Sequence, residues 1–463
     1  MLKVLISYSS ALFASNIFTG ILSFFATMLA AKLLNKTDFG LYNHYVLIYA
    51  TVGIFFISGT QQSLIIFINT DREANEPLFI RLMLTFVLIF SVISGVAFWI
   101  ALRFFSLATC LAIVAIVPNV FTLLAALVYR ASLRARGEVL IRMAISLINS
   151  LFTVGLLLIW TSKYAPIVAD MCSLILPAGI AFFFLHRHTK MSSMFISPFD
   201  PGLRLFWKTT APLWVAGVLF SLNDQIRRII VDWHLGVGDL AILSFVYAVY
   251  TMVQRPVEMI QRSILPVLSI HKNWSGDEKR IMVVNSLIFP FFGLFIFLCY
   301  PILLKLGKYH SYEDTLYYLL IMCSALPIIS VEFIFAAMCI AIGQEKINRD
   351  VMLLAVLINL PISFFMIFYF GLAGAFWAFP IYNISYGIVL GIKLRHIFKE
   401  QISFAASLVA RCIIVYSICL TWIYVCPNIS LASVAIIIFV LGTRCLSMWS
   451  IKQCKEIYWA FKT

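Results

Sequence analysis

The sequence predicts an all-α integral membrane protein with about fourteen transmembrane helices. Hydrophobic residues make up 62% of its 463 residues and charged residues 12%, and the mean hydropathy is +1.00. An average soluble domain is about half apolar and a quarter charged. A bilayer-spanning helix needs roughly 20 apolar residues, and apolar runs of that length recur along the whole chain. They leave no room for a soluble domain.

The apolar runs place the expected helices in chain order. They cover residues 8–31, 41–68, 82–102, 108–130, 140–160, 166–185, 209–233, 241–266, 281–304, 315–342, 351–370, 374–392, 405–426 and 430–449. A polar connection at 191–208 contains Pro198 and Pro201 and separates two groups of six helices. We therefore expect an N-terminal lobe at 1–190, a C-terminal lobe at 209–397, and an additional helix pair with a tail at 398–463.

The distribution of basic residues predicts the orientation. With the N-terminus in the cytoplasm, 22 Lys and Arg residues fall in cytoplasmic segments and six on the opposite side. This bias follows the positive-inside rule and predicts that both termini are cytoplasmic. It also accounts for most of the net charge of +14, so the charge does not indicate a nucleic-acid partner. The connection at 191–208 is then cytoplasmic.

Two short segments suggest an internal repeat. Residues 34–40 (LNKTDFG) join the first two helices, and residues 235–241 (LGVGDLA) join the seventh and eighth. Tyr49 and Tyr250 follow at the same spacing. An even number of helices per half predicts a parallel repeat, as in transporters with two similar lobes.

Motifs for covalent chemistry are missing from the sequence. There is no Walker motif, and the ten cysteines form no CxxC pair or Cys/His cluster, so we expect no ATPase activity, no metal site and no catalytic residues. A membrane-embedded polysaccharide polymerase or glycosyltransferase is disfavoured because no long loop is expected outside the membrane. A transporter without a bound cofactor, driven by a proton or Na⁺, fits better.

Four segments resemble the polysaccharide transporter family. AAKLLNKTDFGLYNHYVLIYA at 30–50 resembles its first-loop signature, and RARG at 134–137 its basic loop after helix four. DQIRRIIVDWHLGVGD at 224–239 resembles its helix-seven stretch, and FGLAGAF at 370–376 its turn between helices eleven and twelve. The order and spacing of these motifs cover about residues 5–400.

The resemblance implies an O-antigen flippase of the Wzx type in the bacterial inner membrane. Such proteins move an undecaprenyl-pyrophosphate-linked oligosaccharide from the cytoplasmic to the periplasmic leaflet during lipopolysaccharide O-antigen biosynthesis. The family shares a fold with multidrug exporters and lipid II flippases, in which two six-helix lobes surround a central cavity and work by alternating access. It also implies a polysaccharide polymerase and a chain-length regulator as partners. The extra helix pair departs from the usual twelve-helix pattern and is similar to that of the lipid II flippases.

Charged residues inside the helices are the candidate substrate-cavity residues, because ionised side chains are expensive in a bilayer. In helix 209–233, Asp224 and Arg228 are four residues apart and share a face, beside Arg227. Arginine suits bidentate phosphate binding, so this face is either a cavity wall that attracts pyrophosphate or an ion pair near the outer interface. Asp232 lies on the same face.

Three further cavity candidates lie in helix 241–266, and one lies alone. Arg255, Glu258 and Arg262 build a polar face in the inner half of the helix, although Arg262 can reach the cytoplasm. Glu332 stands in an apolar run with no charge nearby in sequence. It is either paired with Arg255 or a carboxylate that binds the coupling ion.

Neutral polar residues at membrane depth form a second group. Gln61 and Asn119 are assigned to the cavity, and the group also includes Asn16, His44, Gln62, Asn149, Asn359 and Asn383. More of them are expected in interhelical hydrogen bonds than in the cavity. The candidate charges balance, four basic against four acidic. The alternative function is a cation-coupled multidrug exporter of the same fold, which would favour an acidic and aromatic cavity over a basic one.

Overall fold

The computed structural model describes the backbone of residues 2–57, 60, 64, 67–68, 71–131, 135–160, 162–188, 196–198, 200–270, 277–341 and 344–425. These residues form helices and short connections, and no strand occurs among them. The all-α fold class is thus confirmed. Seven described helices are long and apolar enough to cross a membrane, or eight if one bent pair counts as a span.

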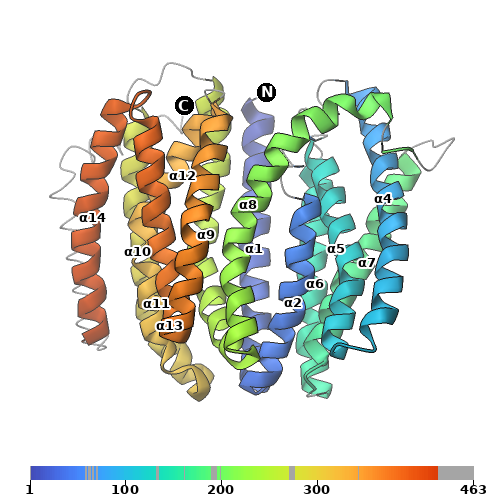
Figure 1. Cartoon of the computed structure of the whole chain (residues 1–463), viewed down its shortest axis with the longest axis horizontal. Coiled ribbons are helices and arrows are strands. Elements are labelled where there is room, and N and C mark those ends of the chain that lie inside the picture. The colour runs from blue at the N-terminus through green and yellow to red at the C-terminus, as the bar shows by residue number, and fades with distance from the viewer. Residues whose placement is uncertain are drawn as a thin grey trace. The chain divides into compact units, whose positions relative to one another are not determined.

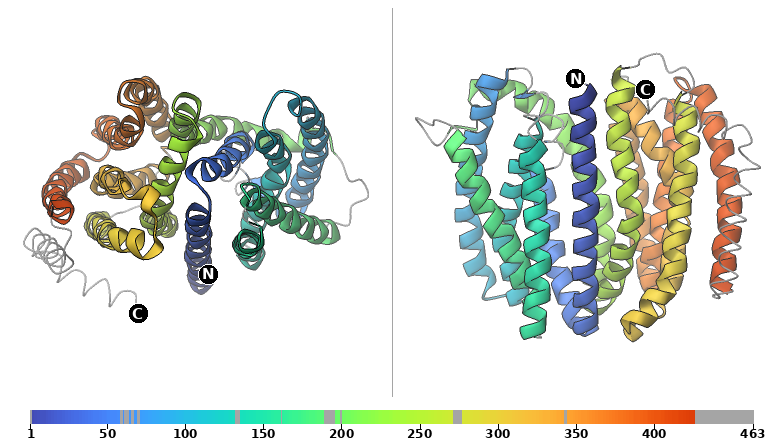
Figure 2. Two further views of the ribbon diagram at one scale, coloured as in Figure 1. Left: turned by 90° about the horizontal axis from the view of Figure 1, so that it is seen from below. Right: turned by 180° about the vertical axis from the view of Figure 1, so that it is seen from behind.

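The chain divides into two compact units, residues 1–245 and 246–463. The elements of the first unit run side by side along a common direction (Figures 1 and 2). They are α1 (Leu2–Leu33), α2 (Lys36–Ile57), α4 (Arg72–Ala101), α5 (Leu107–Ala131), α6 (Ala135–Ile159), α7 (Ala165–His188), the 3-10 turn η1 (Pro201–Leu203) and α8 (Arg204–His234). Helix α9 (Val237–Ile270) begins in this unit and continues into the second.

The second unit contains the remaining described elements. They are α10 (Asp277–Gly307), the 3-10 turn η2 (His310–Tyr312), α11 (Thr315–Cys323), α12 (Leu326–Ala341), α13 (Glu345–Leu394) and α14 (Lys399–Val425). Helix α12 packs on α10, α13 and α14. The hydrophobic core between these helices includes Phe335, Met338, Tyr382 and Tyr386.

Packing in the first unit is built from aromatic and small residues. Helix α6 packs against both α1 and α7, and α5 packs against α2, α4 and α7. Alanines 108, 112 and 115 of α5 recur on one face and lie against Tyr45 and Tyr49 of α2. Small residues let helix backbones approach closely in a membrane, so this face of α5 makes room for the large tyrosine rings.

Two expected helices differ in detail. The single helix predicted for 315–342 is wrong, because the chain breaks between α11 and α12 with a bend of 40°, next to Pro327, which cannot continue a helical hydrogen-bond ladder. The predicted break between 370 and 374 is present inside α13 at Gly371, whose φ of 59° is left-handed. The helix predicted at 430–449 lies outside the described residues, and the count of fourteen stays a prediction.

Helix α8 begins at Arg204, before the start expected at 209. Asp200 caps the preceding turn by accepting a hydrogen bond from the Gly202 amide at 2.8 Å, and the Trp207 indole donates to the Pro198 carbonyl at 2.8 Å. The helix then curves from the end of α4 down beside α2 (Figure 1). Pro212 lies within it, which removes one backbone donor and favours a bend. The lobe boundaries proposed from the sequence stay a prediction.

Candidate functional site

The candidate site consists of charged and polar side chains buried within the membrane-spanning helices. Such side chains are rare in a bilayer and usually mark a transport pathway or a structural pair. In the first unit they lie on α2, α6, α7 and α8. In the second unit the main one is Glu332 on α12. Each group has its own geometry.

The charged face of α8 is partly buried. The Arg227 side chain is fully buried, with 0% of its surface exposed, and Arg228 is half-buried. Asp224 lies on the same helix, but its side chain is outside the described residues. Arg227 is therefore enclosed by protein, and its assignment to a substrate cavity or to an ion pair stays a prediction.

The far end of this face is tied to two other helices through His44. Asp232 of α8 lies 2.5 Å from Nδ1 of His44 on α2, and Nε2 of the same ring lies 3.2 Å from the Thr109 hydroxyl on α5. The side chains of His44 and Asp232 are 23% and 15% exposed. One imidazole therefore joins α2, α5 and α8 at one end of the first unit.

The two similar turns identified in the sequence lie against each other beside this junction. A Cβ atom on Gly40 would lie 1.9 Å from the Val237 carbonyl oxygen, so only glycine fits there. Lys36 in the first turn also interacts electrostatically with Asp239 in the second. The close approach explains why a glycine stands within the first turns of α2.

A second polar cluster surrounds Asp170 on α7. This carboxyl group is 4% exposed and accepts a hydrogen bond from the Asn149 amide of α6 at 2.6 Å. The Asn149 carbonyl in turn accepts a hydrogen bond from Thr153 at 3.0 Å. Tyr45 and Tyr49 of α2 lie close enough to interact with the Asp170 carboxyl. The cluster holds one buried acid between three helices.

Asp170 was not among the site residues predicted from the sequence. It is the only acidic residue of α7, so the reasoning that selected Glu332 as an isolated charge in an apolar run also applies to it. The tyrosines give a further signal, because Tyr42, Tyr45 and Tyr49 follow a helical spacing and put three hydroxyl groups on one side of α2. Neighbouring rings in this row are 6.4 Å and 5.1 Å apart.

Glu332 occupies a comparable position in the second unit. It is 7% exposed, and its buried Oε1 atom makes no hydrogen bond to another side chain among the residues that the structure describes. A Cβ atom on Gly387 of α13 would lie only 2.7 Å from that oxygen. The carboxyl group borders an apolar cavity of about 500 Å³ between α12, α13 and α14, which Arg395 also lines. Glu332 is thus a buried acid at the edge of a cavity.

Several predicted site residues cannot be placed. The side chains of Arg255, Glu258 and Arg262 on α9 lie outside the described residues, as does Gln61. The suggested pair between Glu332 and Arg255 therefore stays a prediction. Asn119 is half-buried on α5.

Two of the other neutral residues make hydrogen bonds within their own helix. Ser363 donates to the Asn359 carbonyl at 3.2 Å, and the Asn383 amide donates to the Phe379 carbonyl at 2.8 Å. These two bonds stay within α13, whereas Asn149 and His44 make the interhelical hydrogen bonds that were expected of this group.

The chemistry available at these positions is binding and ion exchange. Among the residues that the structure describes, no group of three or more His, Cys, Asp or Glu side chains is placed to hold a metal ion. Buried carboxyl groups can take up a proton or a monovalent cation, and a buried arginine can bind an anion. This set suits a transporter.

The fold is that of transporters in the multidrug/oligosaccharidyl-lipid/polysaccharide (MOP) superfamily. The structure of the lipid II flippase MurJ in an inward closed conformation matches with a TM-score of 0.71 and 16% identity, over 97% of this chain and 99% of that one. A multidrug resistance MATE transporter in an inward-facing conformation matches with a TM-score of 0.60 and 15% identity, over 88% and 98%. A MOP transporter from Pyrococcus furiosus matches with a TM-score of 0.55 and 12% identity, over 89% and 96%.

The family of the chain follows from its sequence. The polysaccharide biosynthesis protein family matches residues 7–272, which is more than half of the chain, and the protein belongs to this family. No curated relative is similar enough in sequence to give a significant match. The protein is thus a multi-pass membrane protein of the polysaccharide biosynthesis family with a MOP transporter fold.

Proposed function

We propose that the protein is a flippase for an undecaprenyl-pyrophosphate-linked oligosaccharide, such as an O-antigen repeat unit. It moves this lipid from the cytoplasmic to the periplasmic leaflet of the bacterial inner membrane by alternating access. The observation that carries the proposal is the combination of the family match at residues 7–272 with the fold of a lipid flippase over 97% of the chain. A transporter in polysaccharide biosynthesis needs a cargo made on one side of a membrane and used on the other.

The buried charges support an anionic, hydrophilic cargo. Arg227 of α8 is fully buried, and a guanidinium group matches phosphate geometry. The candidate arginines on α9, Arg255 and Arg262, add to this charge in the proposal. Orientation follows from the Lys and Arg bias, which puts both termini in the cytoplasm and makes the cytoplasmic leaflet the loading side.

We assign the energy source to a coupling proton or Na⁺. Asp170 and Glu332 are the buried acids that support this assignment, one in each compact unit. Burial disfavours the charged carboxylate, so a buried carboxyl group takes up a proton more readily than an exposed one. The downstream partners in this proposal are a polysaccharide polymerase and a chain-length regulator.

A cation-coupled multidrug exporter is the second candidate function. The observation in its favour is the acidic, aromatic cluster formed by Asp170 with Tyr45 and Tyr49, together with the fold match to a MATE transporter. Such a cluster suits an organic cation through charge and ring faces.

Deletion of the gene separates the two functions. A flippase deletant accumulates lipid-linked repeat units on the cytoplasmic face and loses surface polysaccharide, and the plasmid-borne gene restores both. An exporter deletant keeps its surface polysaccharide and becomes sensitive to cationic drugs. Normal surface polysaccharide in the deletant would overturn the flippase proposal.

A further inference from the structure

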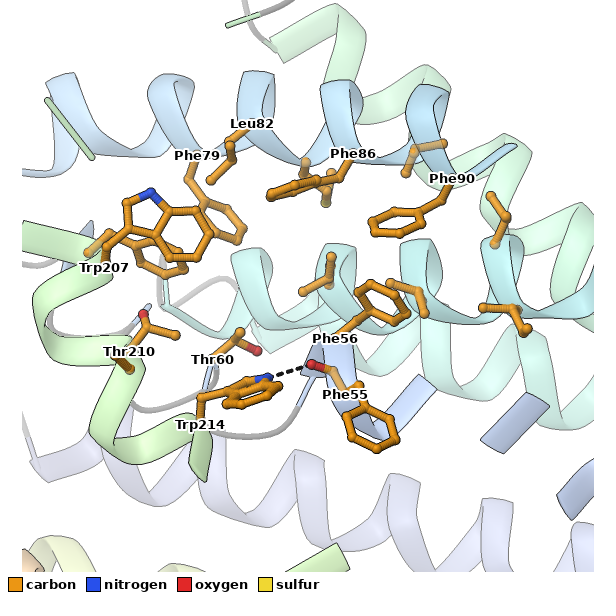
Figure 3. Close-up of a pocket in the computed structure, with 18 residues that line it drawn as sticks. Phe55, Phe56, Thr60, Phe79, Leu82, Phe86, Phe90, Trp207, Thr210 and Trp214 are labelled. Carbon is orange, nitrogen blue, oxygen red and sulfur yellow. Dashed lines mark hydrogen bonds between the residues drawn. The ribbon is translucent and has the colours of Figure 1, made fainter. Parts of the chain in front are cut away.

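The first unit contains an aromatic pocket that the transport site does not use. It has a volume of about 350 Å³ and lies between α2, α4, α5 and α8. Figure 3 shows rings from three of these helices around it. The rings belong to Phe56, Phe79, Phe86, Phe90, Trp207 and Trp214.

The pocket offers almost no polar group to an occupant. The Trp214 indole N–H donates to the Phe55 carbonyl at 2.5 Å, so it is already satisfied (Figure 3). Among the described lining residues, only Thr60 and Thr210 have a side-chain hydroxyl, and they are 8% and 3% exposed. A polar ligand would lose its hydration without compensation here. The occupant is therefore a hydrocarbon.

The shape of the pocket is fixed by ring-to-ring contacts. Phe56 and Phe90 have centroids 4.4 Å apart, and Phe79 and Phe206 have centroids 5.2 Å apart. Both contacts are edge-to-face, a favourable arrangement that holds the rings in defined orientations. Rigid ring faces suit the flat double bonds and methyl branches of an isoprenoid chain better than a freely rotating saturated chain.

Positive charge adjoins the pocket at the start of α8. Arg204 lies one turn before Trp207, and Lys208 lies one turn before Ala211, a further lining residue. Residues three apart on a helix are neighbours on its surface. Both basic side chains are exposed, and Trp207 and Trp214 are 37% and 36% exposed. An apolar pocket with an open, basic margin matches an amphiphile with an anionic head.

We propose that this pocket binds a polyprenyl phosphate. The isoprene units next to the phosphate lie among the aromatic rings, and Arg204 and Lys208 bind the phosphate. The proposal rests on the proposed function, because it names a holding site for the lipid part of the cargo. The pocket lies within the first unit, and its lining includes neither Arg227 nor Asp170.

Photolabelling of the purified full-length protein in phosphatidylcholine nanodiscs tests the proposal. The probe is a polyprenyl phosphate with a diazirine in an isoprene unit close to the phosphate, and labelled peptides are mapped by mass spectrometry. A phosphatidylglycerol with a diazirine in its acyl chain is the comparison, because it has the same charge but an ordinary lipid chain. We expect saturable labelling of α4 and α8 by the polyprenyl probe, displaced by unlabelled undecaprenyl phosphate and not by phosphatidylglycerol.

Matched variants locate the site. Ala211→Phe fills the pocket and is expected to abolish saturable labelling, while Val215→Phe does not, because Val215 is exposed on the same helix and is not in the lining. Arg204→Gln and Lys208→Gln each weaken binding by roughly fivefold, the effect of one basic residue near an anionic lipid surface. These two positions keep the test informative if Ala211→Phe does not fold.

Three results would overturn the proposal. They are equal labelling by both probes, labelling that undecaprenyl phosphate does not displace, and labelling unchanged by the filled pocket. The first would show that the pocket holds ordinary bilayer lipid. A deletant that lacks surface polysaccharide, combined with no saturable labelling, refutes the pocket and leaves the proposed function intact. Saturable labelling combined with normal surface polysaccharide in the deletant supports the pocket and refutes the proposed function.

Discussion

The close contact between the α1–α2 and α8–α9 turns makes a sharp prediction for Gly40. In Gly40→Ala the new Cβ atom would lie 1.9 Å from the Val237 carbonyl oxygen. That atom is backbone and cannot rotate away, so one of the turns must move. Gly238 in the second turn is the matched control, because a Cβ atom there meets nothing within 4 Å.

The expected size of the effect follows from two opposing terms. Overpacking costs about 1–3 kcal/mol, and a clash with backbone belongs at the upper end. Alanine in place of glycine within a helix returns about 1 kcal/mol. The net loss in the free energy of unfolding is then about 2 kcal/mol for Gly40→Ala. Gly238→Ala is expected to be neutral or slightly stabilising.

Thermal unfolding of the detergent-purified protein, followed by tryptophan fluorescence, measures this difference. At about 2–4 °C per kcal/mol, the apparent melting temperature of Gly40→Ala falls by about 4–8 °C. Membrane proteins often unfold irreversibly, so all variants are compared at one heating rate. A Gly40→Ala protein that melts together with wild type and Gly238→Ala would refute the contact between the two turns.

Three further predictions concern the buried polar groups. A double-mutant cycle with His44→Ala and Asp232→Ala, measured by the same melting assay, should give a coupling energy of about 0.5–3 kcal/mol. The exposed Arg349–Asp350 pair is the control and should give about 0–1 kcal/mol. Equal coupling in the two pairs would contradict a structural role for His44. Asp170→Asn should leave protein levels unchanged and abolish ion-driven transport, which is measured as uptake into proteoliposomes. Full ion-driven transport by this variant would show that Asp170 does not carry the coupling ion. Gly387→Ala should lower the melting temperature, because its Cβ atom would displace the Glu332 carboxyl group. Gly391→Ala is the control and should not lower it, because its Cβ atom would lie 4.0 Å from Ile402. If the clash with Glu332 is the cause, the two variants should melt alike in a Glu332→Ala background, and a persistent difference in melting temperature would contradict it.

The all-α membrane fold could be predicted from the sequence because each membrane helix needs its own long apolar run. The break between α11 and α12 could not be predicted from the sequence, because residues 315–342 are apolar on both sides of it. Pro327 alone does not distinguish a broken helix from a continuous, kinked one. The opposite holds at Gly371, where a glycine between two apolar runs indicates the left-handed residue that the structure contains.

Less of the candidate site than of the fold could be predicted from the sequence. Glu332 was selected because an isolated acid in an apolar run must be buried or functional, and the same reasoning reaches Asp170. The partner of Asp232 could not be read, since His44 lies 188 positions away in the chain and only the tertiary packing of α2 on α8 brings them together. The difference between buried Arg227 and half-buried Arg228 depends on the rotation of α8 about its axis, which the sequence does not fix.

The proposed function requires that the protein moves a lipid-linked oligosaccharide across a bilayer. The most direct measurement uses proteoliposomes that contain the purified protein and undecaprenyl-pyrophosphate-linked oligosaccharide in both leaflets, with a membrane-impermeant glycosidase added outside. In protein-free vesicles about half of the oligosaccharide is protected from the enzyme. We expect that the wild-type protein with an imposed proton or Na⁺ gradient removes this protection and that Asp170→Asn does not. Continued protection of the inner-leaflet lipid by wild-type vesicles, under either gradient, would overturn the proposed flippase function.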